Sequence, residues 1–175
     1  MELNKDNQQE RLLGWFSGII EGEGTISIQK VNGKRLVLTP YICIVNTDVR
    51  LINRCIELLN IYDIKSHTYL RDSGVNKPVY QIRIDGMKAV AKLLELVKPI
   101  LVGKQDQAQL VLDYIKQRQA KYFKQDSQGR LRRRPYDLID FGFYEEIKRL
   151  HHTVSPETIR RDIGQPIKDI VRAMQ

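Results

Sequence analysis

The spacing of apolar residues predicts an α+β fold in which one mixed or antiparallel sheet packs against helices along one face. Stretches with apolar residues near every 3.6 positions are interleaved with pairs of short stretches that alternate apolar and polar residues. The resulting order is helix, two strands, helix, two strands and then further helices. At 175 residues, 42% of them hydrophobic, the chain suits one domain with one core. We expect this single domain to span residues 1–175, with its core over about 8–121 and a basic loop and C-terminal helices over 122–175.

The first predicted element is a helix over residues about 7–20, which carries apolar residues near a 3.6-residue period. Gly14, Gly18 and Gly22 follow one another at intervals of four and therefore share one face of this helix. Each glycine inside a helix costs about 1 kcal/mol relative to alanine. Three glycines on one stripe therefore indicate that something packs very close to that face.

Two alternating strands follow, over Thr25–Lys30 and Leu36–Val45, and an Asn-Gly turn at residues 31–34 joins them. Pro40 lies inside the second strand and predicts an edge or a bulge there, because proline cannot donate a backbone hydrogen bond to a neighbouring strand. The polar residues of both strands are expected to share the face of the sheet that the helices leave open.

The rest of the chain repeats this pattern and ends in a helical extension. Asp48 is placed to cap the next helix. Residues 124–135 are polar and rich in arginine, and we predict a loop there. The remaining elements are expected as helices over about 48–60, 87–97, 104–121 and 136–150, strands over Ile64–Arg71 and Val79–Ile84, and a helix at 156–162 after Ser155, with a last helix over 163–175.

Charge is the most informative bulk property. Lysine and arginine number 29 against 21 acidic residues, a net charge of +8. Residues 115–175 carry 14 basic and 8 acidic side chains, so most of the excess lies in the C-terminal third. A basic protein of this kind favours a polyanionic partner, most often nucleic acid, although charge alone is a weak indication.

The two cysteines and the lack of recognisable targeting patterns indicate the cellular compartment. Cys43 and Cys55 lie in apolar stretches without the spacing of a zinc site, and we expect two buried thiols in a reducing compartment. No apolar run approaches the roughly 20 residues of a membrane span. The polar N-terminal residues do not match a secretory signal or a transit peptide. An intracellular location and no membrane partner are therefore expected.

The strongest local pattern is the segment Phe16–Gly24, FSGIIEGEG, in which two carboxylates end an apolar, glycine-rich helix. Acidic groups at a helix C-terminus are unfavourable with respect to the helix dipole, so Glu21 and Glu23 need another reason to be there. A divalent cation is one such reason, since carboxylate and carbonyl oxygens suit magnesium. A solvated acidic turn is the alternative that spacing alone leaves open.

This nonapeptide resembles the signature of the LAGLIDADG homing endonucleases, with Glu21 and Glu23 in place of the two acids of the motif. Residues 99–110, PILVGKQDQAQL, are similar to a P-x-L-x-x-K-x-x-Q-A segment of single-motif members. The resemblance covers residues about 8–120 well and 144–161 loosely. It implies an αββαββα core whose curved antiparallel sheet forms a saddle backed by helices.

The resemblance implies a site-specific, metal-dependent endonuclease, encoded within an intron, that cuts both strands of a long pseudo-palindromic DNA site and leaves 3′ overhangs. With one motif per chain, it also implies a C2 homodimer in which two signature helices meet. Trp15 and Phe16 would anchor the helix in the core of each subunit. The implied dimer interface consists of Gly14, Ser17, Gly18, Glu21 and Gly22.

The implied active site takes Glu23 and the Gly22 carbonyl as ligands of Mg²⁺, with two or three ions per dimer and Mn²⁺ able to substitute. Lys104 would stabilise charge or position water, unless it is an ordinary surface lysine. Asn46 would organise water, and Arg50 would face the phosphate. Both acids are glutamate, where the family's usual pattern has aspartate. Glu21 is expected to support the turn rather than the metal.

The predicted DNA contacts come from the open face of the sheet and from a basic cluster near residue 132. A solvated loop is the alternative for that cluster. The candidates are Ser27, Gln29, Lys30, Asn32, Lys34, Arg35, Thr39, Lys65, His67, Tyr69, Arg71, Lys77, Gln81, Arg83, Arg130, Arg132, Arg133 and Arg134.

Three alternatives stay open at this point. The same fold acts in an RNA maturase or in a DNA-binding regulator that does not cleave, and a basic oligomeric scaffold would leave the acid pair unexplained. No small-molecule substrate is expected. The compartment is either the cytoplasm of a prokaryote or the interior of an organelle, and the sequence does not distinguish the two.

Overall fold

The computed structural model describes residues 3–32, 36–72, 74–75, 77–120, 123–125, 127–128, 131–133 and 135–152. Its fold is α+β, a four-stranded antiparallel sheet with five helices, which confirms the predicted class. The elements are α1 (Leu3–Glu23), β1 (Gly24–Asn32), β2 (Leu36–Asn46), α2 (Val49–Ile61), β3 (His67–Arg71), β4 (Val79–Asp85), α3 (Met87–Val97), α4 (Gln105–Ala120), β5 (Phe123–Gln125), β6 (Leu131–Arg133) and α5 (Leu138–His152).

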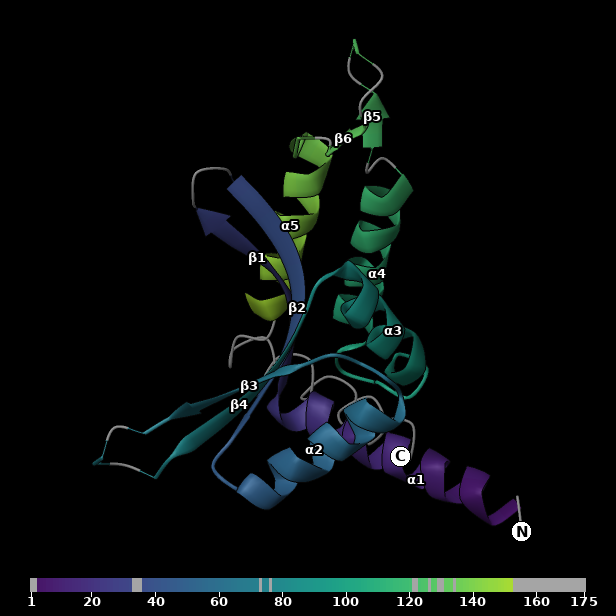
Figure 1. Ribbon diagram of the computed structural model, residues 1–175, viewed down its shortest axis with the longest axis vertical. Coiled ribbons are helices and arrows are strands. Elements are labelled where there is room, and N and C mark those ends of the chain that lie inside the picture. The colour runs from purple at the N-terminus through teal and green to yellow at the C-terminus, as the bar shows by residue number, and fades with distance from the viewer. Residues whose placement is uncertain are drawn as a thin grey trace, which may run out of the picture.

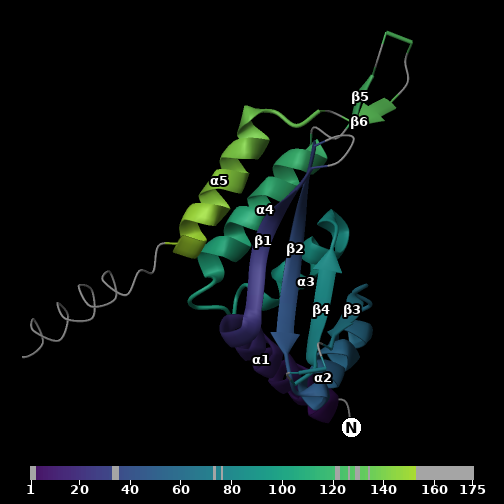
Figure 2. The same cartoon turned by 90° about the vertical axis from the view of Figure 1, so that its left-hand side faces the viewer.

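The main sheet has the strand order β1-β2-β4-β3, and all three neighbouring pairs are antiparallel. Figure 2 shows the four strands side by side, with the helices behind them and at one side. In Figure 1 the β1–β2 pair and the β3–β4 pair run in clearly different directions, so the sheet is strongly curved. The sheet therefore has the antiparallel, curved form that the resemblance implied.

Pro40 interrupts neither the register nor the order of the sheet. The β1–β2 register runs without a bulge and pairs Ile28 with Pro40. β4 ends at Asp85, opposite Tyr41, so β2 has β1 as its only neighbour at Pro40. β2 is a central strand of the sheet, but at Pro40 it is locally an edge, as predicted. Proline lacks an N–H, and no hydrogen bond to β4 is lost because β4 has already ended at this position.

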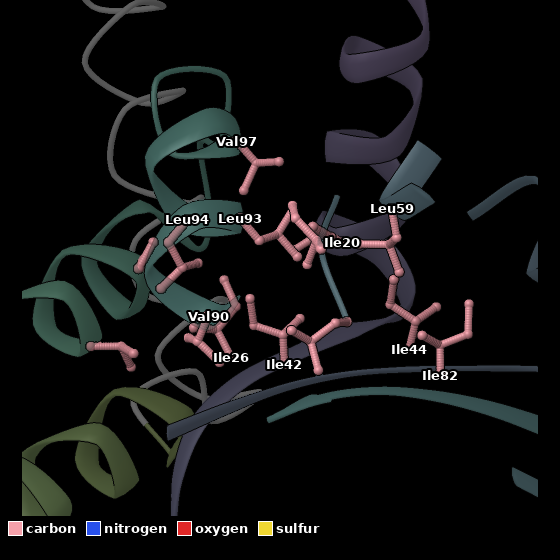
Figure 3. Close-up of a cluster of buried hydrophobic side chains, with 14 of the residues drawn as sticks. Ile20, Ile26, Ile42, Ile44, Leu59, Ile82, Val90, Leu93, Leu94 and Val97 are labelled. Atoms are coloured by element: carbon pink, nitrogen blue, oxygen red, sulfur yellow. The ribbon is translucent and has the colours of Figure 1, made fainter. Parts of the chain in front are cut away.

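The core lies between the inner face of the sheet and helices α1, α2 and α3. Figure 3 shows isoleucines of the strands meeting leucines and valines of α2 and α3, with Ile20 of α1 among them. Every labelled side chain in this cluster is at least 99% buried. Phe16 is also fully buried, as predicted, whereas Trp15 keeps 37% of its surface exposed, so the expectation that it anchors the core is wrong.

α4, α5 and the residues just before α5 pack along one side of the sheet and supply hydrogen bonds to backbone carbonyls that have no strand beside them. The hydroxyls of Tyr114 and Tyr136 donate to the Leu38 carbonyl at 2.9 and 3.2 Å. His151 Nε2 lies 3.0 Å from the carbonyl oxygen of Ile26 in β1, which is an edge strand. These contacts protect backbone groups that no neighbouring strand reaches.

The prediction of a loop over residues 124–135 is wrong, because β5 and β6 pair as an antiparallel hairpin that stands out beyond the ends of α4 and α5 (Figures 1 and 2). α1 continues through the acid pair, three residues past its predicted end. The predicted helices at 156–162 and 163–175 lie outside the described residues.

Two further predictions concern the cysteines and membrane-spanning helices. Cys43 and Cys55 are both buried free thiols, as expected, and burial raises the pKa of Cys55 to about 12. Among the described residues, no helix has both the length and the apolar character needed to cross a bilayer.

Candidate functional site

The acid pair lies in the final turn of α1, and the chain passes directly from Glu23 into β1 at Gly24. Gly24 makes this abrupt change of direction feasible. A Cβ atom at Gly24 would lie 2.6 Å from the Ile20 carbonyl oxygen and 2.8 Å from the Ile20 Cα. Any side chain at this position would clash with the backbone of α1, so the helix and the strand are joined without an intervening loop.

Lys104 closes the C-terminal end of α1. Its ammonium donates to the carbonyl oxygens of Ile20 at 2.8 Å, Glu21 at 2.7 Å and Gly24 at 2.6 Å. The last carbonyls of a helix have no intrahelical partner and carry partial negative charge, so a cation is well placed here. The Gly22 carbonyl is not among the acceptors of Lys104. The alternative of an ordinary surface lysine is therefore wrong.

The ionisation of Lys104 reflects two opposing effects. Burial lowers the pKa of Lys104 from its ordinary value, while the negative charges of Glu21 and Glu23 act in the other direction. Burial is the larger effect. Lys104 is thus a partly desolvated cation next to two carboxylates.

Glu21 binds backbone of its own chain. Its Oε1 accepts a hydrogen bond from the backbone N–H of Val102 at 2.6 Å and from that of Lys104 at 3.3 Å. A Cβ atom at Gly103 would lie only 3.1 Å from the Glu21 Oε2. Glu21 therefore fastens the connection between α3 and α4 to the end of α1, which agrees with its predicted supporting role.

Glu23 is in a different environment. It is exposed, as is Gly22, and within the described part of the chain no hydrogen bond or ion pair engages its carboxylate. The described residues also contain no cluster of three or more His, Cys, Asp or Glu side chains that could hold a metal ion. One chain by itself thus offers a single open carboxylate at the end of α1.

Asn46 lies at the same end of the sheet. β2 pairs Ile44 with Gly24, so Asn46 is two residues further along β2, beside the end of α1. Its Oδ1 accepts a hydrogen bond from the backbone N–H of Asp48 at 2.8 Å. Asn46 therefore orients the loop that leads into α2.

Arg50 forms an ion pair at the start of α2. Asp48 caps this helix, as predicted, by accepting from the Arg50 backbone N–H at 2.9 Å, and the Arg50 guanidinium contacts the same carboxylate at 2.7 Å. These hydrogen bonds lower the pKa of Asp48 to about 2. Among the described residues, no hydrogen bond or ion pair connects Asn46 or Arg50 to Glu23 or Lys104, so the structure does not join the four predicted catalytic residues directly.

The glycine stripe is open in the single chain. A Cβ atom added to Gly14, Gly18 or Gly22 would meet nothing within 4 Å. The packing of this chain therefore does not require glycine at these positions. Ser17 is not part of that open stripe: it is 99% buried and donates to the Leu13 carbonyl at 2.9 Å. A residue already buried in its own subunit has almost no surface left to bury against a partner, which corrects its assignment to the dimer interface.

The face of the sheet turned away from the core, which we call the open face, carries eight of the eighteen predicted DNA contacts. Strand alternation and pairing place eight of the candidates there: Ser27, Gln29, Thr39, His67, Tyr69, Arg71, Gln81 and Arg83. Ser27 retains only 8% exposure. Lys65 and Lys77 are exposed just before β3 and β4.

One of the sheet candidates is misplaced. Lys30 has the same strand parity as the buried Ile26 and Ile28, so it lies on the other face, where its ammonium is 5.8 Å from the centre of the Phe141 ring of α5. The assignment of Lys30 to the open face is wrong. The remaining candidates have side chains outside the described part of the structure: Asn32, Lys34, Arg35, Arg130, Arg132, Arg133 and Arg134.

The structure adds a polar network that the sequence prediction missed. Arg83 Nε donates to Asp85 at 2.8 and 3.0 Å, and Arg83 Nη2 donates to Gln29 Oε1. The Arg83 guanidinium also lies 4.2 Å from the centre of the Tyr41 ring. The spacing of Arg83 and Asp85 at i and i+2 signals a shared face, but only the strand register brings Gln29 and Tyr41 to them.

The open four-stranded antiparallel sheet and the five helices of the described chain match the fold of the LAGLIDADG endonucleases. A family model described as a LAGLIDADG-like domain matches residues 10–98, and the chain belongs to that family. The resemblance noted from the nonapeptide is therefore confirmed. No curated protein sequence matches the chain.

Solved structures of this family have the same fold. The homing endonuclease I-CvuI in complex with its target matches with a TM-score of 0.54 at 16% identity, covering 84% of this chain and 99% of that chain. The archaeal intron-encoded homing endonuclease I-Vdi141I, complexed with DNA, matches with a TM-score of 0.60 at 14% identity, covering 81% and 84%. I-GzeII in complex with its DNA target matches with a TM-score of 0.53 at 12% identity, covering 86% of this chain and 48% of that one.

Proposed function

We propose that this protein is a metal-dependent, site-specific DNA endonuclease that acts as a homodimer. The observation that carries the proposal is the contrast at the end of α1, where Lys104 and Glu21 hold the backbone in place while Glu23 stays open. Family membership and the DNA-bound structures with the same fold support this function.

The homodimer follows from what a single chain lacks. Each chain offers one open carboxylate at the end of α1, and hydrolysis of two strands needs two reaction centres. The stripe of Gly14, Gly18 and Gly22 is open to another backbone, and two such helices related by a two-fold axis would bring both Glu23 side chains together. The chain also spans about half the length of I-GzeII, so a second copy would supply a similar total size.

The residues at this helix end suit a divalent cation such as Mg²⁺. A carboxylate and a backbone carbonyl are hard oxygen ligands, and Lys104 takes the carbonyls on either side of Gly22 but not the Gly22 carbonyl itself. Glu23 and the Gly22 carbonyl of both subunits would hold the cation. When bound, it would polarise the phosphodiester group and lower the pKa of an attacking water.

The chain's own groups would position the DNA around this centre. Lys104 binds the backbone carbonyls of Glu21 and Gly24, which lie before and after Glu23 in the chain, and would add positive charge close to the scissile phosphate. Two copies of the open face, related by the dimer axis, would favour a long pseudo-palindromic target, because each presents the same side chains to its half-site. The Arg-rich hairpin of β5 and β6 would contact the DNA backbone beyond the sheet. As the resemblance implies, the products would carry 3′ overhangs, and the gene would lie within an intron of a prokaryotic or organellar genome.

The experiment is cleavage of a plasmid library of candidate intron insertion sites by the purified protein with Mg²⁺. We expect linearised plasmid with the native protein and at least 100-fold less with Glu23→Gln, while both bind the same target in a gel-shift assay. Glu10→Gln removes an exposed carboxylate from the same helix and should leave cleavage unchanged. Binding without cutting by the native protein would contradict the endonuclease and support a maturase or a DNA-binding regulator.

A further inference from the structure

We propose that Arg83 reads a guanine in each half-site, and that Asp85, Gln29 and Tyr41 are positioning residues for its guanidinium. This inference rests on the proposed DNA-binding function of the open face, and it assigns a specificity-determining residue and the base it recognises.

The register places Arg83 near the acidic end of α1. Thr25, two residues beyond Glu23, pairs with Cys43, and Cys43 pairs with Arg83 in the next strand. Two residues along a strand correspond to about 7 Å. The row of Thr25, Cys43 and Arg83 therefore begins about this far along the chain from Glu23. Arg83 therefore faces the inner part of a half-site, close to the bond that would be cut.

The guanidinium is held in one orientation before any DNA arrives. The single N–H of Arg83 Nε is shared between the two carboxylate oxygens of Asp85, Gln29 accepts from Arg83 Nη2, and the centre of the Tyr41 ring lies 4.2 Å from the guanidinium. The Arg83 side chain is only 21% exposed and that of Asp85 30% exposed. A flexible arginine would have to be ordered on binding, so this arrangement lowers the entropic penalty of recognition.

Charge distinguishes base reading from phosphate binding. The carboxylate of Asp85 neutralises the charge of Arg83, so the pair attracts a phosphate group only weakly. The guanidinium still has N–H donors that do not bind Asp85 or Gln29. Within the described residues, no hydrogen bond engages Arg83 Nη1. Arginine pairs with the O6 and N7 acceptors of guanine, which is the commonest specific contact in the major groove.

Arg71 provides the matched comparison on the same face. It is exposed on β3, and among the described residues no ion pair includes it. An exposed cation of this kind suits phosphate, which fixes position without reading sequence. The two arginines should therefore respond differently when the target sequence is varied.

The test is selection of bound duplexes from a random-sequence DNA library by the full-length protein carrying Glu23→Gln, which prevents loss of DNA by cleavage. We expect guanine, on one strand or the other, at one pair of symmetric positions, and a loss of that preference by roughly 5- to 150-fold with Arg83→Ala. Arg83→Lys keeps the charge but cannot form the same two-pronged contact, so it should lose the preference as well. Asp85→Asn should weaken it by a smaller factor.

Arg71→Ala should leave the selected sequence unchanged and reduce affinity uniformly, with a shallower dependence on salt. Two outcomes for Arg83→Ala would overturn the inference, provided that its thermal unfolding matches that of the parent protein. One is that it weakens binding to all targets equally, and the other is that it still selects the same guanine. If the parent protein selects no sequence at all, the proposed function fails together with this inference, whereas an unchanged profile in Arg83→Ala removes only the role of Arg83.

Discussion

The two sides of α1 differ in what they contact. One side faces its own subunit, with Phe16 and Ile20 fully buried and Glu21 bonded to the connection between α3 and α4. The other side, which we call the open side, consists of Gly14, Gly18 and Gly22, and the exposed Glu23 follows at the end of the helix. The inner side therefore stabilises the subunit, while the open side and Glu23 contribute little to it and are the parts to which the proposed function assigns the partner subunit and the metal ion. Substitutions on the two sides should separate stability from function.

The largest effect on stability is expected for Lys104→Met, on the inner side. Three backbone carbonyls would lose a charged donor at a helix C-terminus, and we expect the free energy of unfolding to fall by about 3 kcal/mol. Urea denaturation measures the change. Lys116→Met removes an exposed lysine from α4 and should alter stability by less than about 0.5 kcal/mol. Equal stability of the two variants would contradict the role of Lys104 as the cap of α1.

A smaller effect should distinguish the two carboxylates. Glu21→Gln keeps an oxygen acceptor for the Val102 N–H but loses its charge, and we expect a decrease of about 1 kcal/mol in the free energy of unfolding. Glu23→Gln removes an exposed charge without a bonded partner in the described chain and should leave that free energy unchanged within about 0.5 kcal/mol. The reverse order would contradict the division of roles at the helix end.

A stabilising effect on the subunit, combined with weaker self-association, is expected for Gly18→Ala. The added methyl group meets nothing within 4 Å, so the isolated subunit should gain up to about 1 kcal/mol from better helix propensity. If a second α1 packs on the open side, the same methyl group should weaken self-association in sedimentation experiments. Gly142→Ala in α5 also adds a methyl group in open space and should stabilise the chain without affecting association. Unchanged association in Gly18→Ala would count against the proposed dimer interface.

Much of the fold could be predicted because its main elements have distinct periodicities. Helix α3 was predicted at its observed bounds, and the alternation around Ile82 and Ile84 gave the correct buried face of β4. The hairpin of β5 and β6 was missed because each strand has three residues, too few to show a period among so many arginines. The prediction for Lys30 is wrong because strand parity determines the face on which a side chain lies, and a charged side chain at a position of the inner parity stays on the inner face.

The candidate site was predictable as a set of residue types but not as a set of contacts. Two acids at the end of an apolar helix pointed to Glu21 and Glu23, yet only the fold brings the N–H groups of Val102 and Lys104, about 80 residues away in sequence, to one of them. The expectation that Trp15 anchors α1 in the core is wrong, because its position on the helix leaves it partly exposed whereas the neighbouring Phe16 is buried. The contacts of Arg83 depend on cross-strand register, which local sequence patterns do not encode.

The loop-free passage from Glu23 into β1 has a mechanical consequence. A flexible connection would let the proposed hydrolytic centre and the proposed base-reading surface adjust separately, but α1 passes into β1 without a loop and Lys104 binds the carbonyls of Glu21 and Gly24 at this junction. Under the proposed function, a duplex that fits the sheet poorly would also be displaced with respect to the Glu23 carboxylate. The cleavage rate of mismatched targets should therefore fall more steeply than their binding affinity. Substitutions in β1 that change the preferred DNA sequence would also change the position of the DNA relative to Glu23.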